Sequence, residues 1–182
     1  MAPLLVVIDM QRVFAEADSP WVVPGFAGLV PAVERLAVAF GDRVVFTRFV
    51  RFDESPGPGA WSDYYALHPF FLRPEAEELT HLAEPFASRD VPILEAPTFS
   101  KYGPQLEALA GPERKIVLCG VATECCVIST ALSAVDAGMR VRVVGDACAG
   151  ATPAGHDAAL TVMRGYEGQL SITTVEEELA RN

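Results

Sequence analysis

Basic residues are few in this 182-residue sequence, and lysine is the scarcest of them. The chain has 14 Lys and Arg against 24 Asp and Glu, for a net charge of -10. This balance argues against a general nucleic-acid partner, because phosphate backbones need a basic patch. No apolar run approaches the length of about 20 residues that a membrane helix needs. We therefore expect neither a nucleic-acid surface nor a membrane span.

The sequence also lacks paired Cys-x-x-Cys spacings and clustered histidines, which argues against a structural zinc site. The residues concerned are Cys119, Cys125, Cys126, Cys148, His68, His81 and His156. Met1-Ala-Pro leads at once into a predicted strand, without a basic segment or a cleavage site. We expect a cytoplasmic protein whose thiols are free and mostly buried, with no disulfide framework, metal or cofactor.

Predicted strands and helices alternate along the chain, without repeats or a dividing linker. This pattern predicts one doubly wound α/β domain over residues 1–182. The predicted strands are Leu4–Ile8, Arg43–Val50, Val91–Leu94, Ile116–Cys119, Arg140–Val144 and Leu170–Thr174. The predicted helices are Phe26–Phe40, Gln105–Ala110, one starting at Glu124, Ala154–Tyr166 (capped by Thr152-Pro153) and Val175–Ala180.

The segment Arg51–Pro74 is too long and too rich in Pro, Gly and aromatic residues for an ordinary connection. We expect a substrate lid or a subunit contact there, with a plain surface loop as the alternative. The following segment, Glu75–Ala87, is expected to form a helix or a broken pair of turns.

The most informative stretch runs from Lys115 to Leu132. An apolar strand is broken at Gly120, Thr123 is a candidate N-cap, and a helix follows. Cys125 and Cys126 then fall in the first helical turn, where free N–H groups and the helix dipole favour a thiolate. The stretch therefore predicts a nucleophilic cysteine at the carboxyl edge of the sheet.

Two further groups are expected at that edge. Asp9 follows the first strand, and the alternative is that it only caps the next turn. Lys101 follows the third strand, whereas Lys115 begins a strand and so lies at the opposite edge. A cysteine nucleophile needs a proton acceptor and a nearby cation, which Asp9 and Lys101 would supply.

Four segments, in this order, resemble the isochorismatase-like cysteine hydrolase superfamily, which includes nicotinamidases and N-carbamoylsarcosine amidases. They are Val6-Val-Ile-Asp9-Met-Gln11-Arg-Val-Phe14, Gly120-Val-Ala-Thr-Glu-Cys-Cys126-Val127, Thr130-Ala-Leu-Ser-Ala134 and Gly145-Asp146-Ala147. The resemblance implies a three-layer fold with a six-stranded parallel sheet flanked by helices. Members usually form homodimers or homotetramers, and we expect the same here.

The resemblance also implies an Asp-Lys-Cys triad of Asp9, Lys101 and Cys126. It further implies a cis peptide between Val121 and Ala122, and an oxyanion hole from the N–H groups of Ala122 and Cys126. Cys125 is the rival nucleophile, but one α-helical step would rotate it about 100° away from Cys126. Many members carry the lysine several residues before a Ser-x-Phe, at a point near Ala96 here if Ser100 is aligned with that serine. Either Lys101 is displaced along the loop or the alignment shifts locally, and a purely surface lysine is the alternative to the assigned role.

Nicotinamidases of the superfamily bind a metal through an Asp-x-His motif after the second strand. This chain has Thr47-Arg48-Phe49-Val50-Arg51 there, so no metal is expected. Arg48 and Arg51 would suit a substrate carboxylate, and pairing with acidic neighbours is the alternative. The other candidates for substrate-binding residues are Gln11, Phe14, Trp61 and Tyr65, each of which would equally suit ordinary packing.

The sequence thus predicts a metal-independent hydrolase of a small molecule, acting on an amide, imide or ureido C–N bond through a thioester. The first alternative is vinyl-ether hydrolysis of isochorismate, with Asp9 as the acid. The second, from another class, is a catalytically silent binding or oligomerisation module with the same fold.

Overall fold

The computed structural model of the chain describes residues 2–182. Six parallel strands form one sheet in the order β3-β2-β1-β4-β5-β6. The strands are β1 (Leu4–Ile8), β2 (Val44–Phe49), β3 (Ile93–Ala96), β4 (Lys115–Val121), β5 (Arg140–Ala149) and β6 (Leu170–Thr173). The predicted doubly wound α/β fold is confirmed, and the order reverses between β1 and β4.

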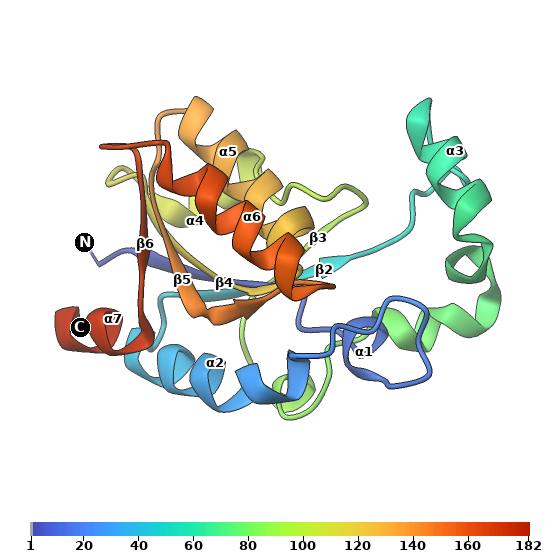
Figure 1. Cartoon of the computed structure of the whole chain (residues 1–182), viewed down its shortest axis with the longest axis horizontal. Helices are drawn as coiled ribbons and strands as arrows, with labels where there is room; N and C mark the ends of the chain where they lie inside the picture. Colours follow the sequence, from blue (N-terminus) through green and yellow to red (C-terminus); the bar gives the residue numbers. More distant parts are fainter. Residues whose placement is uncertain (1) are drawn as a thin grey trace.

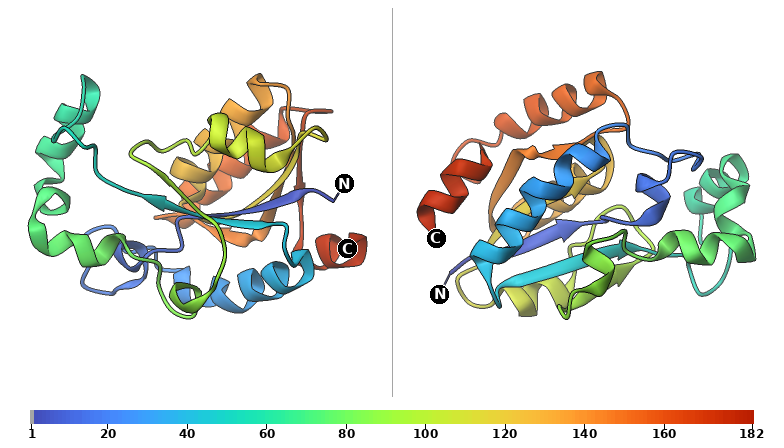
Figure 2. Two further views of the ribbon diagram at one scale, coloured as in Figure 1. Left: turned by 180° about the vertical axis from the view of Figure 1, so that it is seen from behind. Right: turned by 90° about the horizontal axis from the view of Figure 1, so that it is seen from below.

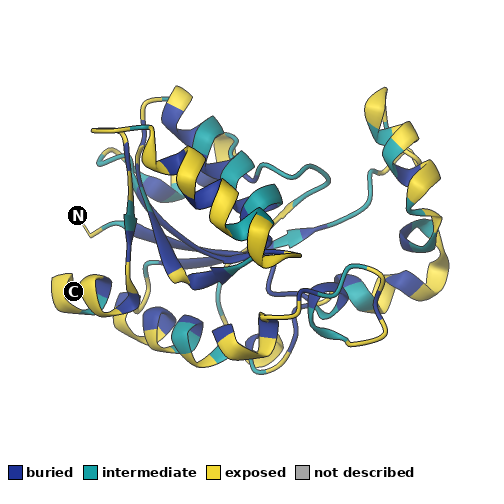
Figure 3. Cartoon of the chain, in the orientation of Figure 1, coloured by how far each residue is buried: buried dark blue, intermediate teal, exposed yellow. Residues whose placement is uncertain are grey.

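Helices cover both faces of the sheet (Figures 1 and 2). One face carries α4 (Pro104–Ala110), α5 (Ile128–Asp136) and α6 (Pro153–Arg164), and the other carries α2 (Phe26–Phe40) and α7 (Val175–Arg181). The central strands β1, β2 and β4 are almost wholly buried between these layers (Figure 3). Burial on both faces explains why β1 is a continuous run of Leu, Val and Ile rather than an alternating pattern. Among residues 2–182, no helix has the length and apolar character to cross a membrane.

The remaining elements lie near the carboxyl ends of β1 and β2 or beyond them. They are α1 (Arg12–Ala15), α3 (Ala60–Leu67) and the 3-10 segments η1 (Pro69–Leu72), η2 (Pro74–Thr80) and η3 (Phe86–Ser88). The segment 51–74, predicted to be irregular, contains α3 and η1, which stand out beyond the sheet in Figure 1. Packing of aromatic side chains stabilises this helix despite its Pro- and Gly-rich start: Trp61 and Tyr64 both contact the Phe99 ring. Of the alternatives for Glu75–Ala87, the structure has separate short turns.

Strand β5 is longer than predicted. The sequence suggested an end at Val144, before Gly145-Asp146, yet the strand continues to Ala149. The pairing of β4 with β5 shifts register between Leu118 and Gly120 and then resumes, with Gly120 opposite Cys148. Such a bulge lets a strand continue past a residue that would otherwise end it.

Gly120 is required by its surroundings. Its φ is +110°, and a Cβ there would lie 2.1 Å from the carbonyl oxygen of Ile8. Any side chain would force β4 away from β1. The close approach brings the end of β4, and the cysteines that follow it, next to the end of β1.

Candidate active site

The candidate site lies where the strand order reverses. Strands β1 and β4 are neighbours, with Ile8 paired to Gly120, so the residues that follow them emerge side by side. Asp9 follows β1, and the Val121–Ala122 peptide, which is cis, ends β4. A crevice at this point is where open α/β sheets bind ligands.

Asp9 and Lys101 form an ion pair. The Lys101 Nζ lies 3.1 Å from Asp9 Oδ2, and neither side chain has any exposed surface. The ammonium also donates to the Thr98 carbonyl at 2.9 Å and lies 5.0 Å from the centre of the Phe49 ring. Removing two charges from water costs free energy that their attraction only partly offsets, so a buried ion pair need not stabilise the fold. Such a pair in a crevice is a better indication of a functional site.

Thr47 fixes the orientation of Asp9. Its hydroxyl donates to Asp9 Oδ1 at 2.6 Å and accepts from the Asp9 N–H at 3.1 Å. Asp9 has φ +47°, a conformation that non-glycine residues adopt at a cost. Among residues 2–182, no group donates a hydrogen bond to Oδ2. This oxygen, next to the ammonium, is therefore available to accept a proton.

The two adjacent cysteines lie on an unusual helical turn. Residues Thr123–Val127 form a π-helical turn, η4, in which the Val127 N–H donates to the Ala122 carbonyl at 3.2 Å. The expectation of an α-helical turn at Cys125 and Cys126 is wrong, because Thr123–Val127 is π-helical. Both cysteines line one cavity, and the choice of Cys126 over Cys125 as nucleophile stays a prediction.

The prediction that Thr123 caps the helix is also wrong. The turn begins after Ala122 without a side-chain cap. The Thr123 hydroxyl instead forms a 2.8 Å hydrogen bond with His156 Nδ1 on α6. That bond joins η4 to α6. Thr152, by contrast, caps α6 as predicted, accepting from the Gly155 N–H.

The expected thiolate at Cys126 is not favoured in the resting protein. Its hydrogen bond with the Cys125 thiol, burial and the Asp9 carboxylate together raise the pKa of Cys126 well above its ordinary value, although Lys101 opposes them. The same hydrogen bond lowers the pKa of the less buried Cys125. The free N–H groups at the turn do not outweigh these effects. Cys126 therefore needs a base to become a nucleophile.

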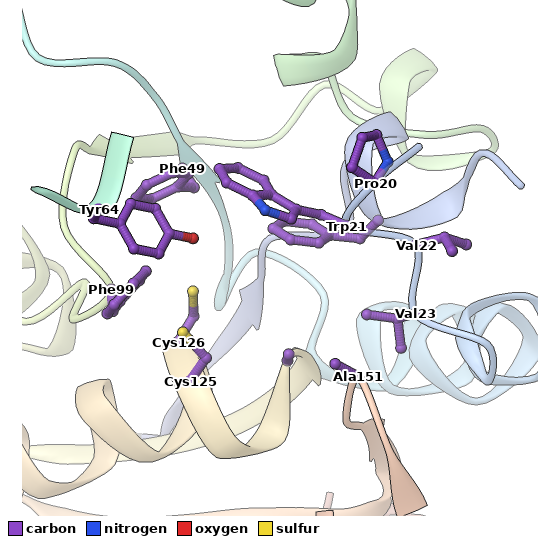
Figure 4. A pocket seen from close by; sticks show the side chains of 12 residues that line it. Pro20, Trp21, Val22, Val23, Phe49, Tyr64, Phe99, Cys125, Cys126 and Ala151 are labelled. Atoms are coloured by element: carbon purple, nitrogen blue, oxygen red, sulfur yellow. The ribbon is translucent and has the colours of Figure 1, made fainter. Parts of the chain in front are cut away.

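Above the two sulfur atoms is a cavity of about 200 Å³ (Figure 4). Its walls come from segments far apart in the sequence. The lining residues are Phe14, Pro20, Trp21, Val22, Val23, Phe49, Tyr64, Phe99, Ala122, Cys125, Cys126 and Ala151. The Tyr64 hydroxyl points into the space above the cysteines in Figure 4.

Of the six side chains predicted to contact substrate, only Phe14 lines this cavity. Gln11 is fully buried, and its amide bonds the backbone of Phe49 and Thr80. Arg48 donates to Thr80 and pairs with Glu95.

The other two aromatic candidates pack behind the wall. Trp61 contacts Phe49, Tyr64 and Phe99, while Tyr65 is 1% exposed and stacks on Phe71. Tyr64, one position before Tyr65, is the residue that reaches the cavity. Whether Tyr64 or Tyr65 faces the cavity depends on how α3 packs against the rest of the protein. The order of aromatic residues in α3 does not determine this.

The sequence matches the family model for the isochorismatase domain over residues 3–177. The chain belongs to this family. Isochorismatase domain-containing protein 2 of Xenopus laevis is 36% identical over 100 residues, which are 53% of this chain and 45% of that relative. The match thus spans less than half of that curated relative.

Solved structures of isochorismatase-like proteins share the fold. A cysteine hydrolase from Pseudomonas syringae has a TM-score of 0.83 at 22% identity, over 98% of this chain and 91% of its own. The pyrazinamidase of Pyrococcus horikoshii, solved in complex with zinc, has a TM-score of 0.65 at 27% identity, over 94% and 98% of the two chains. In this isochorismatase-family chain, the described residues 2–182 contain no group of three His, Cys, Asp or Glu side chains able to hold a metal ion.

Thr130 on α5 joins the lysine loop to the cysteine turn. Its buried hydroxyl donates to the Cys126 carbonyl at 2.7 Å and accepts from the Lys101 N–H at 2.9 Å. We expect Thr130→Val to lower the free energy of unfolding by about 1–3 kcal/mol, since a buried N–H loses its acceptor. Urea unfolding measures this loss. Thr130→Ser, which keeps the hydroxyl, is the control, and equal losses in both variants would contradict the role assigned to the hydrogen bonds.

Several residues of the site were not predicted as functional. Thr47 carries a usable signal, because it is a polar residue within the apolar strand Val44–Phe49. Trp21 and Phe99 carry no such sequence signal. They lie in connections between elements, and the position of those connections depends on tertiary packing. Trp21 contacts six neighbouring rings, among them Phe14, Tyr64 and Phe71.

Proposed function

We propose that this isochorismatase-family hydrolase cleaves a C–N bond of a small amide, imide or ureido compound, with Cys126 as nucleophile and Asp9 as base. The observation that carries this proposal is the fully buried Asp9–Lys101 ion pair beside a pair of cysteines that line a cavity. A buried charge pair next to a nucleophile is characteristic of an active site rather than of a stabilising contact. The amidase names of some structural neighbours agree with it.

In the proposed reaction, Asp9 Oδ2 takes the Cys126 thiol proton as sulfur attacks the substrate carbonyl. The raised pKa of Cys126 makes this transfer necessary. Collapse of the tetrahedral intermediate breaks the C–N bond, and the proton passes from Asp9 to the leaving amine. Water, deprotonated by Asp9, then hydrolyses the thioester, which releases the acid and restores the thiol. Lys101 balances the charge of Asp9 throughout.

The oxyanion of the intermediate requires donors that are already in place. We propose the N–H groups of Ala122 and Cys126, on either side of the start of η4. The cis Val121–Ala122 peptide ends β4 immediately before this turn. Donors fixed in this way are worth several kcal/mol in acyl-transfer enzymes.

The vinyl-ether alternative has less support. Isochorismate is a dicarboxylate, and none of the twelve residues that line the cavity carries a positive charge. The first arginine proposed for such a substrate, Arg48, is held by Thr80 and Glu95. The C–N bond hydrolase is therefore the function that the site supports best.

A panel of small amides, imides and ureides tests the proposal, through ammonia release for primary amides and carbamoyl compounds and through mass spectrometry of the acid and amide products for imides. At least one compound is expected to turn over and to leave an acyl adduct on Cys126, detectable by mass spectrometry after acid quenching. Absence of both turnover and adduct across the panel would instead favour a catalytically silent binding module.

A further inference from the structure

Most of the cavity wall is apolar. Five of the lining side chains are aromatic, and four of these come from the segments that meet above the cysteines: Trp21, Phe49, Tyr64 and Phe99. Phe49 stacks on Phe99 at 5.9 Å between ring centres. None of the twelve lining residues carries a formal charge. Most of the surface of a ligand bound in this cavity would therefore leave water and contact apolar side chains.

The two cations expected at this edge of the sheet, Lys101 and Arg51, are already paired. Lys101, with no exposed side-chain surface, pairs with Asp9. Arg51 forms an ion pair with Glu77 and donates to the Arg73 carbonyl at 3.1 Å. A substrate carboxylate in the cavity would lose its hydration without gaining a counter-ion, which is strongly unfavourable.

One side chain offers a hydrogen bond to a ligand. The Tyr64 hydroxyl points into the cavity, in the space above the two sulfur atoms, in Figure 4. Burial, together with the two cysteines, raises the pKa of Tyr64, so the hydroxyl stays protonated at neutral pH and is a donor. The other polar group of the wall, the Trp21 Nε1–H, already donates to His68 Nδ1 at 3.2 Å.

We propose that the cavity selects small, uncharged amides whose larger part is apolar or aromatic, and that Tyr64 donates a hydrogen bond to a polar atom of the substrate. This inference rests on the proposed function and specifies its substrate class. It excludes substrates that would place a carboxylate inside the cavity. Tyr64 thereby becomes a specificity-determining residue on a segment that lies far from the cysteines in sequence.

Binding to the Cys126→Ser variant tests the substrate class without requiring turnover. The intrinsic fluorescence of Trp21, with Trp61 as the second tryptophan of the chain, reports ligand binding. Benzamide is expected to bind about 100-fold more tightly than 4-carbamoylbenzoate, because the carboxylate is desolvated without a partner. It should bind about tenfold more tightly than acetamide, which buries less apolar surface. Equal or tighter binding of 4-carbamoylbenzoate would overturn the proposal.

Tyr64→Phe tests the hydrogen bond, with Tyr65→Phe as the matched control. Tyr65 is buried behind the wall, and its hydroxyl does not line the cavity. Loss of the Tyr64 hydroxyl should weaken benzamide binding about two- to tenfold, while Tyr65→Phe leaves it unchanged. Equal affinities for all three proteins would overturn the role of Tyr64.

Failure of this inference differs from failure of the proposed function. Cys126-dependent hydrolysis restricted to carboxylated amides would sustain the hydrolase and refute the substrate class. Selective benzamide binding without turnover of any amide would sustain the ligand class and refute the hydrolase.

Discussion

Replacing Cys126 with serine is expected to lower kcat/KM for any amide substrate by about 1,000-fold or more. The serine hydroxyl has a far higher pKa than a thiol, and Asp9 is a weak base for removing its proton. Loss of a nucleophile in an acyl-transfer enzyme typically removes most of the catalysed rate. Ammonia release measured at saturating and at low substrate gives kcat and kcat/KM separately.

Cys125→Ser is the matched control. Both thiols line the cavity and are hydrogen-bonded to each other, so the two variants change neighbouring atoms of the same site. We expect Cys125→Ser to retain activity within about tenfold. Loss of the Cys125 thiol affects one hydrogen bond to Cys126 and leaves Asp9, the proton acceptor, in place. A greater loss in Cys125→Ser than in Cys126→Ser would exchange the roles assigned to the two cysteines.

Lys101→Met is expected to lower the free energy of unfolding by about 3–5 kcal/mol. The variant keeps the apolar stem but leaves the Asp9 carboxylate, with no exposed surface, without its counter-ion. Removal of one partner from a buried ion pair is far more costly than removal of both. Urea denaturation at neutral pH measures the change, provided that the m-value stays constant.

The double variant Asp9→Asn, Lys101→Met separates stability from catalysis. Stability should return to within about 1–2 kcal/mol of the native protein, because no unpaired charge remains. Activity should stay about 100-fold or more below the native value, since the proton acceptor is gone. Recovery of activity together with stability would show that the pair is structural only.

The fold was largely predictable because its signals are local. A continuous β-branched run at Leu4–Ile8 and a helical period at Phe26–Phe40 are each contained within one segment, and the structure has both with the predicted bounds. The errors fall where distant pairing decides. Strand β5 continues beyond Val144 because β4 offers it a partner after the bulge.

The candidate site was predicted in part. The contact between Asp9 and Lys101 could be predicted on two grounds. Parallel strands have their carboxyl ends at the same edge of the sheet, and the chain has only two lysines, one of them at the opposite edge. The type of turn that carries Cys125 and Cys126 was mispredicted, because it is π-helical and not α-helical. The partner of Arg48 depended on where β3 brings Glu95, which no local pattern specifies.

By itself, then, the sequence determined the alternation of strands and helices, the edge of the sheet at which polar groups gather and the identity of those groups. Each of these follows from periodicity or from the direction of a strand. The tertiary structure alone decided the shape and polarity of the cavity. Its wall is built from rings at positions 14, 21, 49, 64 and 99, which meet only when separate segments pack together. Substrate preference is a property of that packed surface, so it could not be inferred from any one stretch of the chain.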